Sequence, residues 1–406
     1  MENKHLLKTS TIALCIFLFI QQVQQILATA TNTTRKAPAI LVFGDSIVDP
    51  GNNNAISTTI KCNFPPYGQN FPHHLSTGRF SNGRIPSDIL ASKLGIKDYV
   101  PAYLDANLTE YDLLTGVSFA SGACGYDPLT AEIMQVLTMD DQLKLFKEYK
   151  QKIKAIAGEK IAEEIISKSY YLIITGADDL ANTYFTTPFR SNYDLSSYIQ
   201  LVVRFASKFY QDLYNLGARR IIVTSIPPIG SIPSQRTLAG GIERNTVPRY
   251  NEAATTCNSE LQKEIQRLNH TLPGANIAFQ DMYTPLLDII QRPSAYGSFE
   301  ICNKSFGCCL FLCGTRYTQE MQSSASAINN RGQMVPVTFY VKFLGFEVSN
   351  RGCCGTGIFE VTLTCNSYTA EPCKDPSKFV FWDTYHLTER AYNILINKLI
   401  AKYGLN

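Results

Sequence analysis

Residues 39–46 read AILVFGDS: a run of five apolar residues, Ala39–Phe43, followed by Gly44, Asp45 and Ser46. A short apolar run that ends in turn residues is typical of a buried strand in a parallel sheet. Ligands of open α/β sheets bind outside the carboxyl ends of the strands, so the Ser46 hydroxyl is predicted to lie at such a site. Because serine after a strand is also a common helix cap, the G-D-S triplet alone is a weak signal.

Downstream of this strand, apolar runs alternate with helical patterns, which predicts a mostly parallel sheet covered by helices on both faces. Further strands are expected at residues 117–120, 171–175, 220–225 and 275–280. Helices are expected at residues 87–94, 140–167, 196–216, 249–268 and 388–403. The sequence therefore predicts one doubly wound α/β domain with three layers, α/β/α, around a central sheet of five strands.

Length and composition agree with a single large domain. The chain has 406 residues, of which 45% are hydrophobic and 17% are charged, which is enough to bury a sizeable core. Its formal net charge is only +3, and the sequence contains no Lys/Arg run. Nucleic acid is therefore not expected as a partner.

The N-terminus has the three parts of a secretory signal peptide. Lys4 and Lys8 precede the apolar stretch Thr11–Ile20, and residues 28–30 form an A-x-A cleavage site. The apolar stretch is shorter than the roughly 20 residues that a membrane span needs, although a membrane anchor is the alternative. We expect residues 1–30 to be a signal peptide and residues 31–406 to be one secreted domain without stable membrane insertion.

Secretion changes how the twelve cysteines are interpreted. Cys15 leaves with the signal peptide, and the others enter an oxidising compartment where disulfides persist. The sequence has neither CxxC pairs nor histidines close to its cysteines, so a zinc site is not expected. The remaining odd number of cysteines leaves at least one thiol unpaired within the chain.

One segment breaks the regular pattern. Phe299–Cys309 (FEICNKSFGCC) is similar to Phe346–Cys354 (FEVSNRGCC), and the residues between them are polar, Cys-rich and without clear periodicity. A long structureless loop is uncommon inside a compact domain. We therefore interpret residues 298–345 as an insertion, either a local duplication or an error in the gene model, and a functional lid is the alternative.

Ester hydrolysis at neutral pH needs an activated nucleophile, a base near its proton and donors for the oxyanion that develops. The usual elbow of serine hydrolases, G-x-S-x-G, does not occur in the chain. Among the five histidines, His386 follows Asp383 at a spacing that lets a short turn bring the carboxylate to the imidazole. The alternative is an Asp at a helix N-terminus beside an incidental His.

The first of several motifs is Phe43–Asn54 (FGDSIVDPGNNN), which contains Ser46. It resembles the first block of the plant GDSL esterases and lipases, a branch of the SGNH hydrolases. The others follow in the family's order: residues 64–68 (FPPYG), 77–84 (TGRFSNGR), 116–122 (GVSFASG), 176–184 (GADDLANTY), 217–236, 350–357 (NRGCCGTG) and 381–389 (FWDTYHLTE). The resemblance covers nearly all of residues 37–403 except the insertion.

The resemblance implies the three-layer SGNH-hydrolase fold, which is flavodoxin-like, and a catalytic triad. Ser46 would be the nucleophile, His386 the general base and then the acid, and Asp383 the carboxylate that orients the imidazole. The backbone N–H groups of Ser46 and Gly122 would hold the oxyanion. No metal or organic cofactor is implied.

Two residues depart from the family's pattern. The third block usually reads G-x-N-D, and its Asn donates the third hydrogen bond to the oxyanion, but Asp178 stands at that position here. An ionised carboxylate only accepts hydrogen bonds, whereas a protonated one could donate if burial and the neighbouring Asp179 raise its pKa. We therefore expect a slow or acid-favouring enzyme, although G-x-D-D followed by A-N-T-Y-F resembles a subgroup associated with pollen coats and anthers. Leu387 replaces the usual Pro and is expected to loosen the turn modestly.

Other residues of these motifs are expected to support the fold. Asp49 and Asn52 would shape the loop after the nucleophile. Cys124 stands where the family usually has a small residue, so it is the candidate for the unpaired thiol. The cysteines that remain outside the insertion allow several connectivities: Cys62, Cys257, Cys353, Cys354, Cys365 and Cys373. The insertion adds Cys302, Cys308, Cys309 and Cys313.

The implied function is hydrolysis of an acyl ester, from a small molecule or a lipid, through an acyl-enzyme on Ser46. Acyl transfer to an alcohol uses the same triad and is the alternative within enzymes. From a different class, a catalytically weak or inactive lipid-binding or coat protein on the same scaffold would fit Asp178 and the insertion. The intact Ser46, Asp383 and His386 favour the enzyme. The sequence predicts no particular oligomeric state.

Overall fold

The computed structural model describes residues 37–403, apart from 304–307, 316–320 and 329–333. The predicted signal peptide, residues 1–30, lies outside the described residues. Within the described part of the chain, no helix has both the length and the apolar character that a membrane crossing requires.

The central sheet is parallel, and its four strands pair in chain order: β1 (Ile40–Gly44), β2 (Tyr170–Ile174), β3 (Arg220–Thr224) and β4 (Asn276–Gln280). Residues 117–121 run beside the other edge of β1. The Val42 N–H donates to the Val117 carbonyl at 3.1 Å, and the Phe119 N–H donates to the Val42 carbonyl at 2.7 Å. This segment pairs with β1 through a single parallel bridge, so the fifth strand expected at 117–120 is present only in reduced form.

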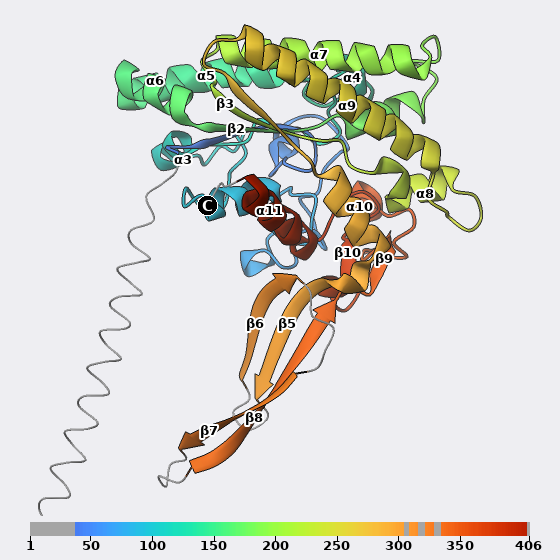
Figure 1. The fold of residues 1–406 in the computed structure, drawn as a ribbon. Coiled ribbons are helices and arrows are strands. Elements are labelled where there is room, and N and C mark those ends of the chain that lie inside the picture. The colour runs from blue at the N-terminus through green and yellow to red at the C-terminus, as the bar shows by residue number, and fades with distance from the viewer. Residues whose placement is uncertain (1–36, 304–307, 316–320, 329–333, 404–406) are drawn as a thin grey trace, which may run out of the picture.

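Successive residues of the strands point into two separate hydrophobic cores, because side chains alternate across a sheet. Leu41 and Phe43 belong to one core, which is covered by α5 (Met139–Ala157), α7 (Leu195–Asn215) and α9 (Pro248–Thr271). Ile40 and Val42 belong to the other core, which is covered by α2 (Pro86–Lys93), α10 (Tyr283–Gln291) and α11 (Glu389–Tyr403). Figure 1 shows α5, α7 and α9 on one side of the sheet and α10 and α11 on the other. The predicted three-layer α/β/α fold is confirmed.

Helix positions follow the sequence predictions with one correction. The single helix predicted at 140–167 is wrong, because the structure has two helices there, α5 and α6 (Glu159–Lys168). Gly158 ends α5 with a φ of 81°, a conformation that glycine adopts without the steric cost of a Cβ. Apolar periodicity continues on both sides of this glycine, which is why the break was missed. Shorter helices were also missed: α3 (Glu110–Thr115), α4 (Pro128–Met134), α8 (Pro233–Ala239) and α10.

The segment without clear periodicity forms a second, antiparallel sheet with the strand order β6-β5-β8-β7. Its strands are β5 (Tyr296–Asn303), β6 (Cys308–Thr315), β7 (Met321–Ile328) and β8 (Met334–Gly345). Figure 1 shows this sheet extending away from the three-layer domain. The Phe346 N–H donates to the Tyr296 carbonyl at 3.0 Å, so the segment leaves and re-enters the domain at one point. This closure favours an insertion at 298–345, which stays a prediction.

The C-terminal motifs lie around a small parallel sheet of two strands, β9 (Val348–Gly352) and β10 (Phe379–Phe381). The loop between these strands is closed by two disulfides, Cys353–Cys373 and Cys354–Cys365. These cross-links fix the loop before it reaches β10 and the turn that follows.

Three cysteines of the described residues are buried thiols: Cys62, Cys124 and Cys257. The prediction that Cys124 is unpaired is confirmed. Cys62 and Cys257 are unpaired as well. Cys257 lies in the core under α9, and Cys62 lies in a different hydrophobic cluster beside the disulfides.

Candidate active site

Ser46 lies in the turn that follows β1, at the carboxyl end of the sheet. The turn requires glycine at position 44, where φ is 132° and a Cβ would lie 1.9 Å from the Ile174 carbonyl oxygen of β2. The Asp45 N–H donates to the same carbonyl at 3.0 Å. The order of the sheet reverses between β1 and β2, because residues 117–121 lie beyond β1. Ligands of open α/β sheets bind at this kind of reversal.

Asp383 and His386 lie in the turn that follows β10. Asp383 Oδ1 accepts the backbone N–H groups of Tyr385 at 2.8 Å and of His386 at 2.7 Å. The Trp382 N–H donates to the His386 carbonyl at 2.7 Å and closes the turn. His386 Nδ1 lies 2.9 Å from Oδ1 and 2.8 Å from Oδ2 of Asp383. The same carboxylate therefore shapes the turn and orients the imidazole.

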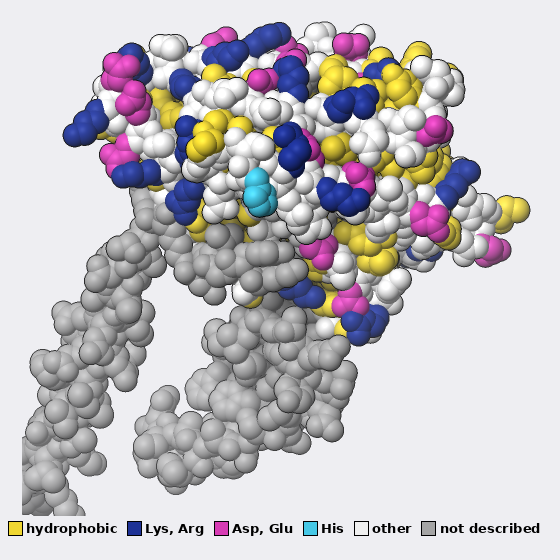
Figure 2. All heavy atoms as spheres, turned by 45° about the horizontal axis from the view of Figure 1, so that its top comes forward, with side chains coloured by type: hydrophobic (Ala, Val, Ile, Leu, Met, Phe, Trp, Pro, Cys, Tyr) yellow, Lys and Arg dark blue, Asp and Glu magenta, His cyan; other side chains and the backbone are white. Residues whose placement is uncertain are grey.

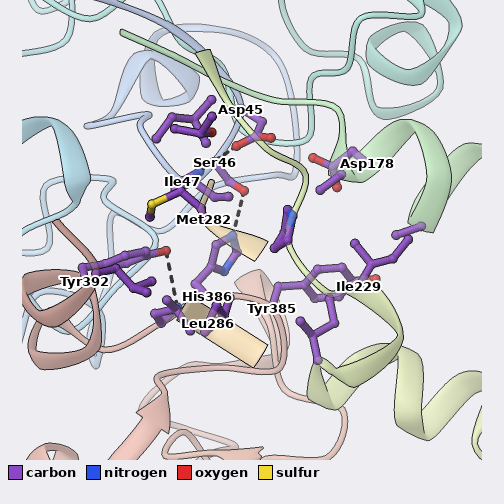
Figure 3. A pocket seen from close by; sticks show the side chains of 18 of the residues that line it. Asp45, Ser46, Ile47, Asp178, Ile229, Met282, Leu286, Tyr385, His386 and Tyr392 are labelled. Carbon is purple, nitrogen blue, oxygen red and sulfur yellow. Dashed lines mark hydrogen bonds between the residues drawn. The ribbon is translucent and has the colours of Figure 1, made fainter. Parts of the chain in front are cut away.

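The turn brings His386 to Ser46, from which it is separated by 340 residues in the chain. The distance between His386 Nε2 and Ser46 Oγ is 2.7 Å, and Figure 3 marks this contact. Asp383 is fully buried and His386 is nearly so. With Asp383 on Nδ1, the other ring nitrogen faces the hydroxyl, which is the order that serine hydrolases use. The three side chains that the sequence selected thus lie within bonding reach of one another.

Asp383 has a further partner that the sequence prediction missed. The Tyr67 hydroxyl donates to Asp383 Oδ2 at 2.8 Å, and the same hydroxyl accepts the Thr362 N–H at 2.9 Å. Tyr67 is buried against Trp382, with their ring centroids 6.2 Å apart. The F-P-P-Y-G motif had been noted only as part of the resemblance, and nothing in its local pattern indicates a contact 316 residues away.

The expectation that the Gly122 N–H holds the oxyanion is not supported. That N–H donates to Asp49 Oδ2 at 3.0 Å, and a buried carboxylate is a strong acceptor that keeps the donor occupied. The glycine is needed for packing, because a Cβ there would lie 2.5 Å from the Phe80 ring. The Phe80 ring in turn lies beside the His386 imidazole, with centroids 5.1 Å apart. Gly122 therefore supports the wall behind His386.

Asp49 and Asn52 support the loop after the nucleophile, as predicted. Asp49 Oδ1 accepts the N–H groups of Gly51 at 2.8 Å and of Asn52 at 2.7 Å. The Asn52 side chain donates to the carbonyls of Ser118 and Ala120, both at 2.8 Å. These bonds tie the loop to the segment beside β1. Burial raises the pKa of Asp49 to about 6.

Asp178 lies at the start of the short helix Asp179–Tyr184 that follows β2, on the same cavity as Ser46 and His386 (Figure 3). The Asn182 amide donates to Asp178 Oδ1 at 2.5 Å, and the Tyr385 hydroxyl donates to Asn182 Oδ1 at 2.9 Å. This chain of bonds fixes the Asp178 carboxyl on the cavity wall.

Burial raises the pKa of Asp178 to about 6, and the nearby His386 charge opposes this shift. Asp179, which had been expected to raise it, instead bonds elsewhere: its carboxylate accepts the N–H groups of Tyr126 at 2.8 Å and of Asp127 at 3.1 Å. Asp45 has a pKa well above the usual range through burial and the charge of Asp178, and its Oδ2 is buried without a hydrogen-bond partner. A protonated Asp45 agrees with this environment.

A narrow cavity of about 70 Å³ opens beside Ser46 and His386. Its aliphatic and aromatic lining consists of Ile47, Ile174, Ala177, Ala181, Pro227, Ile229, Ile232, Met282, Leu286, Phe381, Tyr385, Leu387, Tyr392 and Leu395. The Leu387 N–H donates to the Tyr392 hydroxyl at 3.3 Å, a bond that Pro at this position would lose, and the looser turn expected for Leu387 stays a prediction. Within the described ranges, no three His, Cys, Asp or Glu side chains are grouped to hold a metal.

Fold and site together define an α/β protein with a serine-hydrolase arrangement at the carboxyl end of its sheet. Residues 40–399 match the family described as GDSL-like Lipase/Acylhydrolase. The chain therefore belongs to the GDSL lipase family, a family of carboxylic ester hydrolases.

Curated relatives from Arabidopsis thaliana cover nearly the same extent. GDSL esterase/lipase EXL3 is 45% identical over 366 residues, which make up 90% of this chain and 87% of that protein. GDSL esterase/lipase At5g42170 is 42% identical over 366 residues, or 90% of this chain and 86% of that protein. GDSL esterase/lipase EXL2 is 38% identical over an alignment of 410 positions, gaps included, which covers 96% of this chain and 94% of that protein.

Proposed function

We propose that the chain is a secreted serine esterase or lipase that hydrolyses acyl esters through an acyl-enzyme on Ser46. The observation that carries the proposal is the 2.7 Å contact between Ser46 Oγ and His386 Nε2, with Asp383 on the other ring nitrogen. His386 Nε2 takes the hydroxyl proton while Oγ attacks the ester carbonyl carbon. The carbon–oxygen bond to the alcohol then breaks, and the alcohol leaves with the proton from His386.

Deacylation reverses these roles with water in place of the alcohol. His386 removes a proton from the water, the hydroxyl oxygen attacks the acyl carbon, and Ser46 Oγ recovers its proton as the acid leaves. Asp383 accepts the hydrogen bond from Nδ1 and stabilises the imidazolium that forms in each half of the reaction. Acyl transfer would follow the same course with a second alcohol in place of water.

Two groups are proposed as oxyanion donors: the Ser46 backbone N–H and the protonated carboxyl of Asp178. Asp178 stands at the position of the family's Asn, and the pKa of about 6 allows a substantial protonated fraction in mildly acidic solution. Because Asn182 bonds to Oδ1, the proton would reside on Oδ2. Gly122 is left out of the proposal because Asp49 occupies its N–H.

The apolar cavity beside Ser46 supports an acyl chain as the part of the substrate that is buried. Its lining is mostly aliphatic and aromatic, and apolar surfaces bind hydrocarbon by removing it from water. The polar residues of the lining are Asp45, Ser46, Asp178, Thr224, Ser225 and His386. Secretion rests on the predicted signal peptide and is supported by the two disulfides in the loop before β10.

A fluorophosphonate label tests the nucleophile directly, because it reacts only with an activated serine. The wild-type chain should be labelled and should hydrolyse p-nitrophenyl butyrate, and Ser46→Ala should abolish labelling. Ser225→Ala is the matched control, since Ser225 lines the same cavity but its hydroxyl contacts the N–H groups of Met282 and Tyr283 instead of a histidine. We expect His386→Ala to lower kcat by about 10⁴-fold or more.

If the folded wild-type chain does not take the label, the alternative of a non-catalytic lipid-binding or coat protein is favoured. Asp178, at the position of the family's oxyanion donor, is the observation that supports this alternative. A labelled enzyme that forms more transfer product than acid when a competing alcohol is added would instead be an acyltransferase.

A further inference from the structure

Exposed apolar side chains gather on two neighbouring segments near the active-site turn. Leu238 at the end of α8 and Ile242 in the loop that follows are 60% and 99% exposed. Phe359 and Leu363, in the loop closed by the Cys354–Cys365 disulfide, are 69% and 53% exposed. We call these four side chains the docking surface. Figure 2 shows hydrophobic side chains, coloured yellow, at the end of the domain where α8 lies. Exposed apolar side chains that lie together mark interaction sites, whereas single scattered ones are ordinary.

Hydrogen bonds hold the two segments of the docking surface together. The Thr237 hydroxyl of α8 donates to the Ile358 carbonyl at 2.9 Å. The Arg244 guanidinium donates to the Asn350 carbonyl of β9 at 3.1 Å. Figure 1 shows α8 on the same side of the molecule as β9 and β10. These hydrogen bonds hold α8 and the loop after it in a fixed position relative to β9 and the disulfide-closed loop.

The same two segments contact the turn that carries Asp383 and His386. The Thr384 N–H donates to the Glu360 carbonyl at 3.1 Å, next to Phe359. On the α8 side, the Gln235 amide donates to the Tyr385 hydroxyl at 3.2 Å, and Tyr385 lines the cavity. Both segments of the docking surface are thus joined to the catalytic turn by direct hydrogen bonds.

Positive charge accompanies the docking surface. Arg236 Nε donates to the Arg244 carbonyl at 2.7 Å, and the hydrogen bonds that Arg244 makes in the described structure go to neutral acceptors. Burial and the neighbouring Arg244 lower the pKa of Arg236, and burial and Arg351 lower that of Arg244. Of the acidic residues on these segments, Glu360 is occupied by nearby N–H groups, and Glu243 is exposed. In the described part of the chain, these hydrogen bonds of Arg236 and Arg244 go to neutral oxygens, so their positive charges are not neutralised by those partners.

We propose that the docking surface and its arginines hold the enzyme on an anionic lipid surface. Apolar side chains that enter the acyl boundary, flanked by arginines that meet negative headgroups, are the combination that binds membrane interfaces. The inference rests on the proposed ester hydrolysis, because binding to a lipid surface would bring the enzyme to lipid esters that are part of that surface. Binding itself is measured without catalysis.

The test is co-sedimentation of the full chain, carrying Ser46→Ala so that no lipid is consumed, with vesicles of phosphatidylcholine alone or with added phosphatidylglycerol. We expect binding to the mixed vesicles, weaker binding in high salt, and a loss of about tenfold or more in Ile242→Ser/Phe359→Ser. Ile161→Ser is the matched control, because Ile161 is 53% exposed on α6, at the other end of the domain in Figure 1. Arg351→Gln should weaken binding, and Lys160→Gln on α6 should not.

In the catalytic chain, Ile242→Ser/Phe359→Ser should hydrolyse soluble p-nitrophenyl butyrate at the wild-type rate and lose activity only on the vesicles. The proposal is overturned if the chain binds neither kind of vesicle, or if the double substitution leaves binding unchanged. It is also overturned if gel filtration shows that the wild-type chain is a dimer and that the same substitutions convert it to a monomer. If the wild-type chain does not hydrolyse the soluble ester, the proposed function is contradicted, whereas binding to vesicles in the sedimentation experiment would still support the docking surface.

Discussion

At the residue scale, Asp383 has more partners than its own turn provides. The Tyr67 hydroxyl donates to Asp383 Oδ2, joins the N-terminal motif to the C-terminal one and helps to hold the carboxylate in its place against His386. Tyr67 touches neither Ser46 nor the cavity, so we regard it as a positioning residue.

Tyr67→Phe should lower kcat by about tenfold while leaving KM nearly unchanged, because the imidazolium that forms during the reaction loses part of its support. Tyr171→Phe is the matched control, since that buried hydroxyl also donates one hydrogen bond, to the Ile166 carbonyl, far from the site. Steady-state kinetics and thermal unfolding of both variants separate the roles. Equal losses of kcat in the two variants, or a loss explained by unfolding, would contradict a positioning role.

Asp178→Asn should raise kcat at pH 8 and remove the preference for mildly acidic solution. With a pKa of about 6, the Asp178 carboxyl is a donor below that pH and an anion above it. Two pH units above its pKa only about a hundredth of such a group is protonated, so an amide donor should gain about 10–100-fold at pH 8 and little at pH 6. The pH profile of kcat measures this.

Asp45→Asn is the control for the Asp178 prediction, because it removes the neighbouring buried carboxyl without placing an amide at the donor position. The role given to Asp178 fails if Asp178→Asn brings no gain at pH 8, or if Asp45→Asn brings the same gain.

At the element scale, the second sheet is attached to the domain through a single pair of neighbouring strands. Gly297 of β5 pairs directly with Gly345 of β8, and the Phe346 N–H bond to Tyr296 closes the same point. β9 begins at Val348, after this closure, so the strands and the loop that lead to the catalytic turn contain no residue of the second sheet.

Replacing residues 298–344 by an Asn-Gly turn should leave the three-layer domain and its activity intact. Gly297 and Gly345 would become neighbours of a two-residue hairpin turn, which the antiparallel pairing already favours. We expect kcat/KM for a soluble ester to stay within about twofold, since long surface segments contribute little to the free energy of unfolding. Thermal unfolding and esterase assays check this. A changed KM with intact folding would indicate the lid alternative.

At the scale of the whole molecule, several buried carboxyls are less acidic in the folded chain than in the unfolded one. Burial raises the pKa of Asp49 to about 6 and that of Asp179 to about 7, against an ordinary value near 3.9 for the unfolded chain. Between roughly pH 4 and 7 the folded state therefore holds more protons than the unfolded state. The free energy of unfolding must fall as pH rises through this window.

We therefore expect Tm to be several degrees higher at pH 5 than at pH 8. Asp179→Asn should lower Tm overall, because one acceptor for the Tyr126, Asp127 and Thr130 donors is lost, and it should flatten the pH dependence. Calorimetry across the pH range tests both statements. A Tm that rises steadily from pH 5 to 8 would contradict the assignment.

Local patterns were enough to predict the central strands and the long helices, because alternation and apolar periodicity are set by neighbouring residues. They failed at Gly158, where one conformation interrupts a continuous pattern, and at residues 117–121, which contribute a bridge in place of a strand. They also failed for β5–β8, because the residues that form them show no regular alternation.

The sequence by itself determined the family, the order of the layers and the choice of Ser46, Asp383 and His386, because each of these depends on motifs read along the chain. Only the tertiary structure decided that the Gly122 N–H donates to Asp49, that Tyr67 supports Asp383, and that burial raises the pKa of the Asp178 carboxyl. The physical reason is that hydrogen-bond partners and desolvation depend on groups that are distant in sequence, and no local pattern encodes which of them will meet.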